Sequence, residues 1–532
     1  MADFYYKFGN TDSLTFYNGN KVMSVEDEHS SVYLLGFAHV CGETVRDFLK
    51  KILQDFHIGQ IAEIKKHLLG QYLIILRKND TLYLFSDFLQ TRSIYYDKER
   101  KIASSSFQTL YGQYEKRKKN DYKAFEFLSM RHCLYPVWLG DSTLSDRIRR
   151  ITAFEYLAIH LQSGEMTVGK LKFEINNRKI DSLQKLVSYS KKTLREAIRH
   201  PEYKDKKIYT TLTGGFDSRL VTSFVHEYYT DAHLRISSLT NTESLDFKIA
   251  SEVAHILSSP LKVYETDPDK QTETYYRLTE GLSPKENRIM TSLYQCEKRG
   301  DVEFGGMFGT ELYTILGYAT CDELIQNYVT RSRQYTVADE EYYKRFESAL
   351  RKEFEDIRSC YLLQVPNERD LMRIFQLIIT GRFASRFVAA LQLYGNSYDV
   401  CGTFPIIEAG LRIPYKYLGS KWSLGRYYLI PKILVNQINK KVSLAETCHF
   451  CPMAPLSLST LASYVKGKFE QNRYYHKRLQ TNCPPKELTL RTAHFSYSSD
   501  DWFEGFMQTY YDTSSSPKKQ EIGLHNNCQD ID

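Results

Sequence analysis

The sequence predicts a mixed protein in which an α+β domain is followed by an α/β domain with a parallel sheet. Two patterns lead to this fold class. Over residues 1–165, short apolar runs of strand length alternate with turn residues. From residue 181 onward the apolar residues recur with the period of a helix, and strand-like and helix-like segments then alternate along the chain.

A β-hairpin is the clearest expectation in the first domain. Residues 71–77 and 81–85 are apolar runs joined by the turn residues Asn79 and Asp80, a combination typical of two antiparallel strands. Apolar residues between positions 41 and 66 have helical spacing. Further short strands are expected at 93–96 and 101–105.

The second domain begins with a helix and continues as an alternation of strands and helices. Apolar residues within 183–198 share one helical face, and 207–212 is a buried-strand signal that ends in glycines. A helix at 218–229, a strand at 234–239 and a helix at 246–257 follow. This order predicts a β-α-β-α unit, in which neighbouring strands run parallel.

The predicted domains therefore cover residues 1–165 and 180–510, with helices dominating beyond about residue 320. The segment 511–532 is polar and poor in apolar anchors. We expect it to be a mobile tail.

Composition excludes several classes of protein. The chain has 532 residues, of which 42% are hydrophobic and 25% charged, with a net charge of +7. This size supports two or three domains, each with its own core, and the dilute charge argues against a dedicated nucleic-acid binder. No uncharged apolar run approaches the roughly 18–20 residues of a membrane helix. We therefore expect neither nucleic acid nor a membrane as a partner.

The N-terminus and the cysteines predict a cytoplasmic location. The first seven residues, Met1 to Lys7, have no basic segment followed by an apolar stretch, so a secretory signal is not expected. The 10 cysteines are dispersed, which favours reduced thiols. Cys448 and Cys451 form a CxxC pair with no second pair at metal-ligand spacing. Buried thiols are therefore favoured over a zinc site.

The strongest chemical signal is Thr213-Gly214-Gly215-Phe216-Asp217-Ser218, at a predicted junction of strand and helix. The glycines leave backbone N–H groups open to an anion such as phosphate, and the dipole of the following helix adds positive potential. Asp217 offers a hard oxygen for Mg²⁺, while Thr213 and Ser218 add hydroxyl groups. The alternative is an ordinary glycine turn capped by Asp217 or Ser218. The spacing is not that of a Walker loop, which disfavours transfer of the γ-phosphate.

This hexapeptide resembles the SGGxDS loop of the PP-loop ATP pyrophosphatases, and in particular that of asparagine synthetase and its relatives, the β-lactam synthetases and lasso-peptide cyclases. Residues 244–257 resemble the helix after the family's second strand, and Gly305-Gly306-Met307-Phe308-Gly309-Thr310-Glu311 stands where the family has SGEGADE. The matching segments of the first domain are Leu69-Gly70-Gln71-Tyr72, Ser86-Asp87-Phe88, Ser93-Ile94-Tyr95-Tyr96, Ala103-Ser104-Ser105 and 141–164. The resemblance implies a nucleophile-hydrolase-like αββα glutaminase-type domain, followed by a PP-loop synthetase domain with a helical C-terminal part.

The resemblance also implies cofactors and residue roles. ATP and Mg²⁺ would be the cofactors, with Asp217 and Thr310 on the metal. Lys440 or Lys441 would stabilise the transition state and the leaving pyrophosphate, unless they are a solvated surface pair, and Glu311 would remain as an acidic catalytic group. The residues that would hold the nucleotide are Leu212, Thr213, Gly214, Gly215, Asp217, Ser218, Leu239, Gly305 and Gly306.

Both predicted sites depart from the family's pattern. Ala2 stands where glutamine-hydrolysing members have a nucleophilic cysteine, so this domain cannot split glutamine by that route, although Asp87 remains where the family binds the glutamine amino group. Met307 replaces the glutamate of SGEGADE and Thr310 replaces its aspartate. These changes remove negative charge from the expected metal and acceptor region.

The resemblance predicts an ATP-dependent amide-bond synthetase that adenylates a small-molecule or peptide carboxylate for attack by ammonia or a substrate amine. Asparagine synthesis and closure of a lactam or macrolactam are both open, and the losses at both sites leave open a non-catalytic nucleotide-binding protein. A PP-loop enzyme acting on transfer RNA is disfavoured, because the one local basic cluster is 116–119. No motif specifies the substrates or the source of ammonia. The oligomeric state is likewise open, and a homodimer is one possibility.

Overall fold

A computed structural model gives the arrangement of most of the chain. Ala2, Leu239, the basic cluster 116–119 and the predicted tail 511–532 lie outside the described residues. The described residues are 4–8, 13–16, 22–114, 120–200, 203, 206–236, 244–262, 301–392, 396–420, 423, 425–481, 489–491 and 495–498.

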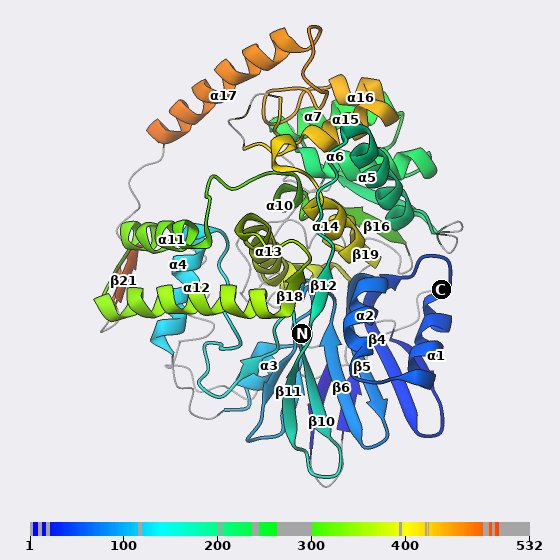
Figure 1. Cartoon of the computed structure of the whole chain (residues 1–532), viewed down its shortest axis with the longest axis vertical. Coiled ribbons are helices and arrows are strands. Elements are labelled where there is room, and N and C mark those ends of the chain that lie inside the picture. Colours follow the sequence, from blue (N-terminus) through cyan, green and yellow to red (C-terminus); the bar gives the residue numbers. More distant parts are fainter. Residues whose placement is uncertain are drawn as a thin grey trace.

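The protein is a mixed α/β structure with several sheets (Figure 1). Among the described residues of the N-terminal part, two antiparallel sheets have the strand orders β11-β10-β6-β5-β4-β3 and β2-β1-β8-β7-β9. The first sheet contains β3 (Met23–Glu26), β4 (Ser30–His39), β5 (Leu69–Lys78), β6 (Thr81–Ser86), β10 (Glu155–His160) and β11 (Met166–Lys170). The second contains β1 (Phe4–Lys7), β2 (Ser13–Phe16), β7 (Tyr95–Asp97), β8 (Ile102–Ser104) and β9 (Arg149–Arg150).

The predicted hairpin is confirmed, and the predicted helical stretch at 41–66 is two helices instead of one. β5 and β6 pair through Lys78 and Thr81, and Asn79 takes the left-handed conformation at φ 52° that an asparagine tolerates in such a turn. The helical stretch divides into α1 (Val45–Asp55) and α2 (Gln60–His67). Phe56 adopts a non-helical ψ of 125°, and the side chain of Gln60 accepts the His57 N–H, which starts the second helix afresh.

The two antiparallel sheets face each other, with helices on the outside. Apolar side chains from both sheets form a shared core that includes Tyr6, Leu73, Ile75, Ile94 and Leu157. On the outer faces, α1 packs on β3 and β4, and α3 (Phe107–Tyr111) packs on β7 and β8. The order of layers is therefore helix, sheet, sheet, helix.

A parallel sheet follows, in the strand order β15-β14-β13-β16-β19. Its helices confirm the predicted β-α-β-α order, although α6 begins two residues earlier than the expected position 218. The strands are β13 (Ile208–Leu212), β14 (His233–Ile236), β15 (Leu261–Lys262), β16 (Val302–Gly305) and β19 (Asn396–Asp399). The helices are α5 (Leu183–Ile198), α6 (Phe216–Tyr228) and α7 (Leu245–Leu257).

The order of these strands locates a switch point. From β13 the chain proceeds to β14 and β15 on one side, and then returns to form β16 and β19 on the other side. The ends of β13 and β16 therefore diverge above the same edge of the sheet. Ligands of open parallel sheets bind at such a point, outside the carboxyl ends of the strands.

The chain beyond residue 320 is mostly helical, as predicted. The described α-helices beyond residue 320 are α11 (Cys321–Tyr335), α12 (Glu340–Cys360), α13 (Glu368–Gln392), α14 (Phe404–Leu411), α15 (Leu429–Ile438), α16 (Lys440–Leu444) and α17 (Leu461–Thr481). Earlier in the chain, α4 (Asp121–Cys133) belongs to the N-terminal part and α10 (Gly309–Tyr313) follows β16. Short strands pair as β12 (Phe173–Ile175) with β18 (Tyr361–Leu363), and as β17 (Thr336–Ala338), β21 (Phe495–Ser498) and β20 (Thr489–Arg491).

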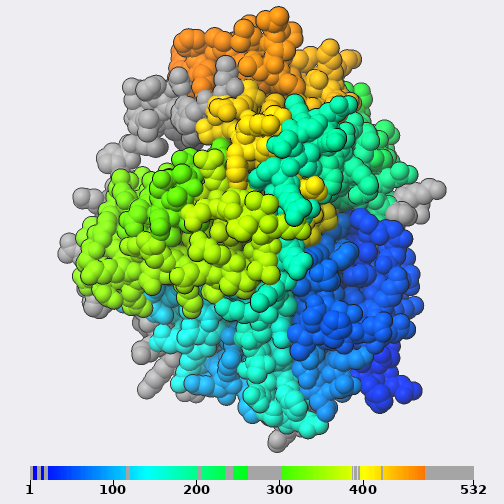
Figure 2. All heavy atoms as spheres, in the orientation of Figure 1, coloured from blue at the N-terminus to red at the C-terminus, as the bar shows by residue number. Residues whose placement is uncertain are grey.

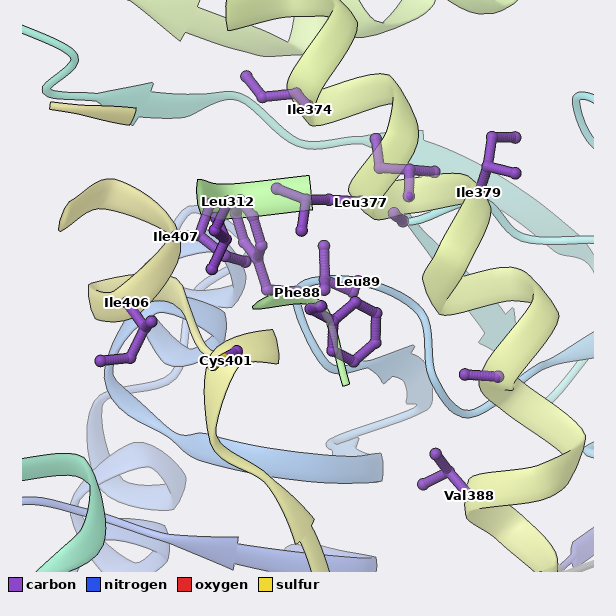
Figure 3. Close-up of a cluster of buried hydrophobic side chains, with 14 of the residues drawn as sticks. Phe88, Leu89, Leu312, Ile374, Leu377, Ile379, Val388, Cys401, Ile406 and Ile407 are labelled. Atoms are coloured by element: carbon purple, nitrogen blue, oxygen red, sulfur yellow. The ribbon is translucent and has the colours of Figure 1, made fainter. Parts of the chain in front are cut away.

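The N-terminal sheets and the later elements share one hydrophobic core. A continuous cluster of buried side chains extends from Val32 to Met453. Figure 3 shows Phe88 and Leu89 beside Leu312 of α10 and Leu377 of α13. The antiparallel sheet extends past residue 165, because β11 ends at Lys170, and β12 then forms a separate parallel pair with β18.

Two further observations concern the whole of the described chain. Its helices include none that is both long and apolar enough to cross a membrane. Its cysteines, Cys448 and Cys451 included, are free thiols, in agreement with the sequence-based expectation.

Candidate nucleotide-binding site

The glycine loop lies at the switch point, between β13 and α6. Leu212 ends β13 and is fully buried. Gly215 is the N-terminal cap residue of α6, and no side chain caps the helix. A Cβ atom on Gly214 would lie 2.6 Å from Asp246 Oδ1 and 3.1 Å from Cys448 Cβ. A side chain at position 214 would therefore have to displace the Asp246 carboxylate, which favours glycine there.

The loop amides are arranged around oxygen acceptors. The Gly214 N–H donates to Asp246 Oδ1 at 2.8 Å, and Asp246 belongs to the first turn of α7. The Thr213 N–H donates to Ser218 Oγ at 3.1 Å, and the Gly215 N–H donates to Thr213 Oγ1 at 3.2 Å. One of these amides therefore already holds a carboxylate. A loop that binds one anionic oxygen through its backbone has the chemistry to bind another.

Asp217 is the central carboxylate of the site. Its Oδ2 atom accepts hydrogen bonds from the Thr310 N–H at 3.2 Å and from Thr310 Oγ1 at 3.0 Å. Thr310 Oγ1 also lies 2.6 Å from the Tyr428 hydroxyl. Asp217 Oδ1 is buried and has no hydrogen-bond partner within the described part of the chain. Burial raises the pKa of Asp217 to about 6, against the lowering effect of the hydrogen bonds from Tyr428 and Thr310.

Glycines after β16 allow a second loop to pack directly on Asp217. A Cβ atom on Gly306 would lie 2.8 Å from the backbone carbonyl of Asp217 and from the Ser218 nitrogen. A Cβ atom on Gly309 would overlap the Asp217 carboxylate, and one on Gly305 would overlap that of Asp399. The structure thus brings the predicted residues 305, 306 and 310 to the predicted loop, and it adds Gly309.

Asp399 supplies a carboxylate that the sequence comparison with SGEGADE does not reveal. It ends β19 and is buried, and its Oδ1 atom accepts the Met307 N–H at 3.2 Å. Burial raises its pKa to about 6, opposed by that hydrogen bond. Met307 supplies no carboxylate of its own, but the carboxylate of Asp399, from a neighbouring strand, lies against its backbone.

Glu311 is buried behind the same loop. Its carboxylate accepts a hydrogen bond from Thr380 Oγ1 at 2.7 Å. Burial raises its pKa to about 7, and the negative charge of Asp217 acts in the same direction. No salt bridge is found for Asp217, Glu311 or Asp399 among the described residues. The site therefore concentrates negative charge without a compensating cation, an arrangement that favours a metal ion.

The protein alone does not enclose that ion. No group of three or more His, Cys, Asp or Glu side chains in the described ranges is placed to hold a metal. Asp217 and the Thr310 hydroxyl fit Mg²⁺ as a partial set of oxygen ligands, because this ion keeps several waters and binds through one or two carboxylates together with substrate phosphates.

The segment after α16 covers the glycine loop. The guanidinium group of buried Arg219 donates to the carbonyl oxygens of Ala445 at 2.7 Å and Glu446 at 2.6 Å. The Cys448 N–H donates to the Gly214 carbonyl at 2.8 Å, and the His449 ring stacks on Phe216. In the sequence this segment is marked by the CxxC pair. The structure shows that the backbone N–H of Cys448, and not its thiol, makes the contact with the glycine loop.

Lys440 and Lys441 begin α16, and both are exposed. No contact found within the described residues joins either side chain to the glycine loop. The structure places them just before the covering segment, with both side chains exposed to solvent.

Asp87 is occupied within its own turn. Its carboxylate accepts hydrogen bonds from Thr91 Oγ1 at 2.6 Å, from the Thr91 N–H at 3.1 Å and from the Leu89 N–H at 3.1 Å. Burial raises its pKa, although these hydrogen bonds and Lys65 lower it. These contacts give Asp87 a structural role in the turn that carries Phe88 into the shared core.

Comparisons with known proteins add little to this geometry. No protein-family model matches the chain. No curated protein matches it either. A solved structure of glutamine phosphoribosylpyrophosphate (PRPP) amidotransferase from B. subtilis, complexed with ADP and GMP, aligns with 11% sequence identity and a TM-score of 0.18. The alignment covers 59% of this chain and 61% of that chain, and a similarity this low assigns neither a family nor an activity.

Proposed function

We propose that this chain is an ATP-dependent carbon–nitrogen ligase that forms AMP and pyrophosphate. It would adenylate a carboxylate and pass the acyl group to an amine. The observation that carries the proposal is the buried, unpartnered Asp217 Oδ1 beside a glycine loop at the switch point of a parallel sheet. A hard cation on that oxygen would satisfy it, and a phosphate would lie at the N-terminus of α6, which no side chain caps.

Each predicted residue has a role in this proposal. Thr213, Gly214, Gly215 and Ser218 would hold the phosphates, with Gly305 and Gly306 closing the site. Leu212 and Leu239 would frame the adenine. Asp217 and Thr310 would hold Mg²⁺, which would neutralise negative charge on the phosphates. Attack of a carboxylate on the α-phosphate requires that neutralisation on both the α-phosphate and the departing pyrophosphate.

The second half-reaction needs an amine and a general base that accepts a proton from it. Glu311 lies one residue beyond Thr310 and has a pKa raised by burial to about 7, which suits a general base near neutral pH. Lys440 or Lys441 would reach the pyrophosphate only if the covering segment moves, since both side chains are exposed. Ala2 favours ammonia or a substrate amine over hydrolysed glutamine, so lactam or macrolactam closure is an alternative to asparagine synthesis.

A second candidate is a nucleotide-binding protein without turnover. Two observations favour it: Thr310 provides a hydroxyl where the family has a carboxylate, and Asp246 already accepts the Gly214 N–H. Such a protein would bind Mg-ATP and release no pyrophosphate from any carboxylate.

The test uses the purified chain with ATP, Mg²⁺ and aspartate, and with either ammonium or glutamine. AMP, pyrophosphate and asparagine are followed together by mass spectrometry. Asparagine formed with ammonium and not with glutamine supports the ligase with an inactive glutaminase half. The Asp217→Ala variant should lose pyrophosphate release, whereas Asp231→Ala, a change at an exposed aspartate, should not. Nucleotide binding with no pyrophosphate release from any carboxylate supports the second candidate.

A further inference from the structure

Lys432 is a buried cation without an anionic partner. It lies on α15 with 1% of its surface exposed. Its Nζ atom is 5.1 Å from the ring centroid of Phe216 and 4.8 Å from that of Tyr464. Within the described residues it has no salt bridge and no side-chain hydrogen bond. Buried charges in proteins are normally paired, so this ammonium calls for an explanation.

A cavity opens beside the ammonium, between α15, α17 and the loop that precedes α15. It contains no aspartate or glutamate among its lining residues. Its volume of about 30 Å³ is enough for roughly two to three water-sized groups, which matches the oxygens of one carboxylate or phosphate group. The residues that line it are Ser423, Gly425, Tyr427, Lys432, His449, Cys451, Tyr464, Gly467, Lys468 and Gln471.

α17 closes this cavity through a close backbone contact. A Cβ atom on Gly467 would overlap the carbonyl oxygen of Phe450, so the helix lies directly on the 447–452 loop. The Tyr464 hydroxyl donates to the Ala454 carbonyl at 2.6 Å, which holds the same helix turn in place. Figure 2 shows α17, in orange, along the upper edge of the molecule, against the yellow segment that leads into α15. The cavity is therefore built from rigid contacts around the ammonium.

The aromatic rings alone do not compensate the buried charge. Cation–π contacts contribute only modestly to stability, whereas the desolvation of a buried ammonium is costly. Burial lowers the pKa of Lys432 to about 8, and the Cys451 thiol is the group that acts in the opposite direction. The other titratable groups that face the cavity are His449, Tyr427, Tyr464 and Lys468. None of them supplies a negative charge at neutral pH.

Gln471 adds a second donor to the cavity. Its side chain is 6% exposed and has no hydrogen bond within the described part of the chain. An amide N–H group and an ammonium facing the same small space are the donors that carboxylate and phosphate oxygens accept from.

We propose that this cavity binds a small oxyanion, a carboxylate or phosphate group, against the Lys432 ammonium. No residue of 212–218 or 305–311 lines the cavity, although the Lys432 ammonium also lies over the ring of Phe216 in the glycine loop. The proposal therefore does not depend on the proposed ligase activity, and Lys432 is not among the residues to which that activity assigns a role.

The first test measures anion binding by the full-length protein at pH 7. Inorganic phosphate and acetate are titrated separately by isothermal calorimetry, with chloride at equal ionic strength as the reference. We expect binding of one oxyanion over chloride, and the two arms distinguish phosphate from carboxylate. Lys432→Met should weaken that binding at least about tenfold, because a charged hydrogen bond is lost. Lys466→Met, which removes an exposed charge from α17, the other helix beside the cavity, should leave this binding unchanged.

A second measurement uses the unaltered protein, so that it does not depend on the folding of a variant. The pKa of Lys432 is followed by NMR of lysine labelled with carbon-13 at Cε, with the signal assigned through Lys432→Arg. An oxyanion held against the ammonium should raise this pKa by about one unit or more. The proposal is overturned if neither anion binds, if Lys432→Met binds as tightly as the parent, if Lys466→Met loses as much, or if saturating anion leaves the Lys432 pKa unchanged.

Discussion

The side-chain amide of Gln71 pairs with both backbone groups of Asp399. Its Nε2 atom donates to the Asp399 carbonyl at 3.1 Å, and its Oε1 atom accepts the Asp399 N–H at 2.8 Å, across 328 residues of sequence. Gln392 in turn donates to the Gln71 carbonyl at 2.9 Å. This contact joins β5 of the antiparallel sheet to the end of β19, directly beside the loop that contains Met307. The N-terminal part thereby positions a carboxylate of the candidate site.

Replacing Gln71 with leucine should destabilise the protein by about 2–4 kcal/mol, because two buried backbone groups lose their partners. Urea unfolding followed by circular dichroism measures the change. Gln162→Leu, at an exposed position, is the matched control and should cost less than about 0.5 kcal/mol. If the two variants have equal free energies of unfolding, the hydrogen bonds between Gln71 and Asp399 do not stabilise the protein measurably.

Asp399→Asn should change how stability depends on pH. Burial raises the pKa of Asp399 in the folded state to about 6 from 3.8. The protonated carboxyl group therefore makes its full contribution to the free energy of unfolding below pH 3.8, and this contribution is lost as the pH rises to about 6. Asparagine does not titrate, and it keeps an acceptor for the Met307 N–H. We expect the two proteins to be similar at pH 4, and the variant to be more stable by about 1–3 kcal/mol at pH 8.

The measurement is the free energy of unfolding in urea at pH 4, 6 and 8 for both proteins. Asp231→Asn, at an exposed site, controls for the loss of one negative charge. A difference between Asp399→Asn and the parent that stays constant over this range would contradict the assignment of a raised pKa to Asp399.

Gly306→Ala should abolish nucleotide binding if the proposed site is correct. The added methyl group would lie 2.8 Å from the Asp217 carbonyl and the Ser218 nitrogen, so the two loops must separate. We expect the Kd for Mg-ATP, measured by calorimetry, to rise at least about tenfold, equivalent to about 1.4 kcal/mol. Gly317→Ala is the control, because a Cβ atom there meets no atom within 4 Å. Unchanged affinity in Gly306→Ala would remove this loop from the nucleotide site.

The buried pair of Arg382 and Glu353 should be costly to break. The guanidinium donates to the carboxylate at 3.0 and 2.7 Å, and both side chains are 1% exposed. Arg382→Met leaves the Gly140 N–H as the hydrogen-bond donor to Glu353 among the described residues, so we expect the free energy of unfolding in urea to fall by about 3–5 kcal/mol. Arg351→Met, which breaks exposed bridges to Asp322 and Glu347, should cost about 1 kcal/mol or less. Similar losses in both variants would be inconsistent with this difference in burial.

The sequence predicts those features that depend on neighbouring residues. The hairpin at 71–85, the glycine loop and the alternation of strands and helices from 207 to 257 all follow from local periodicity and turn residues. The break between α1 and α2 was missed, because the apolar spacing continues through Phe56 although its backbone leaves the helix.

The rest of the candidate site comes from residues far apart in the chain. Tyr428, Thr380 and Asp399 reach Thr310, Glu311 and Met307 only after the parallel sheet and the C-terminal helices have assembled. No spacing rule connects such positions in one sequence. The burial of Lys432 is likewise not predictable from the sequence, because a lysine on an amphipathic helix is expected at the surface.

The contact between α13 and the turn at Leu89 limits which deletions from the gene the fold can tolerate. A Cβ atom on Gly381 would overlap the Leu89 carbonyl, and Figure 3 shows Phe88 and Leu89 among the side chains of the later helices. If the first third of the gene were deleted, Leu312 and Leu377 of the encoded fragment would face water, and this fragment would aggregate. The later helices therefore depend on the N-terminal region to bury their apolar side chains, a role that requires no substrate in that region.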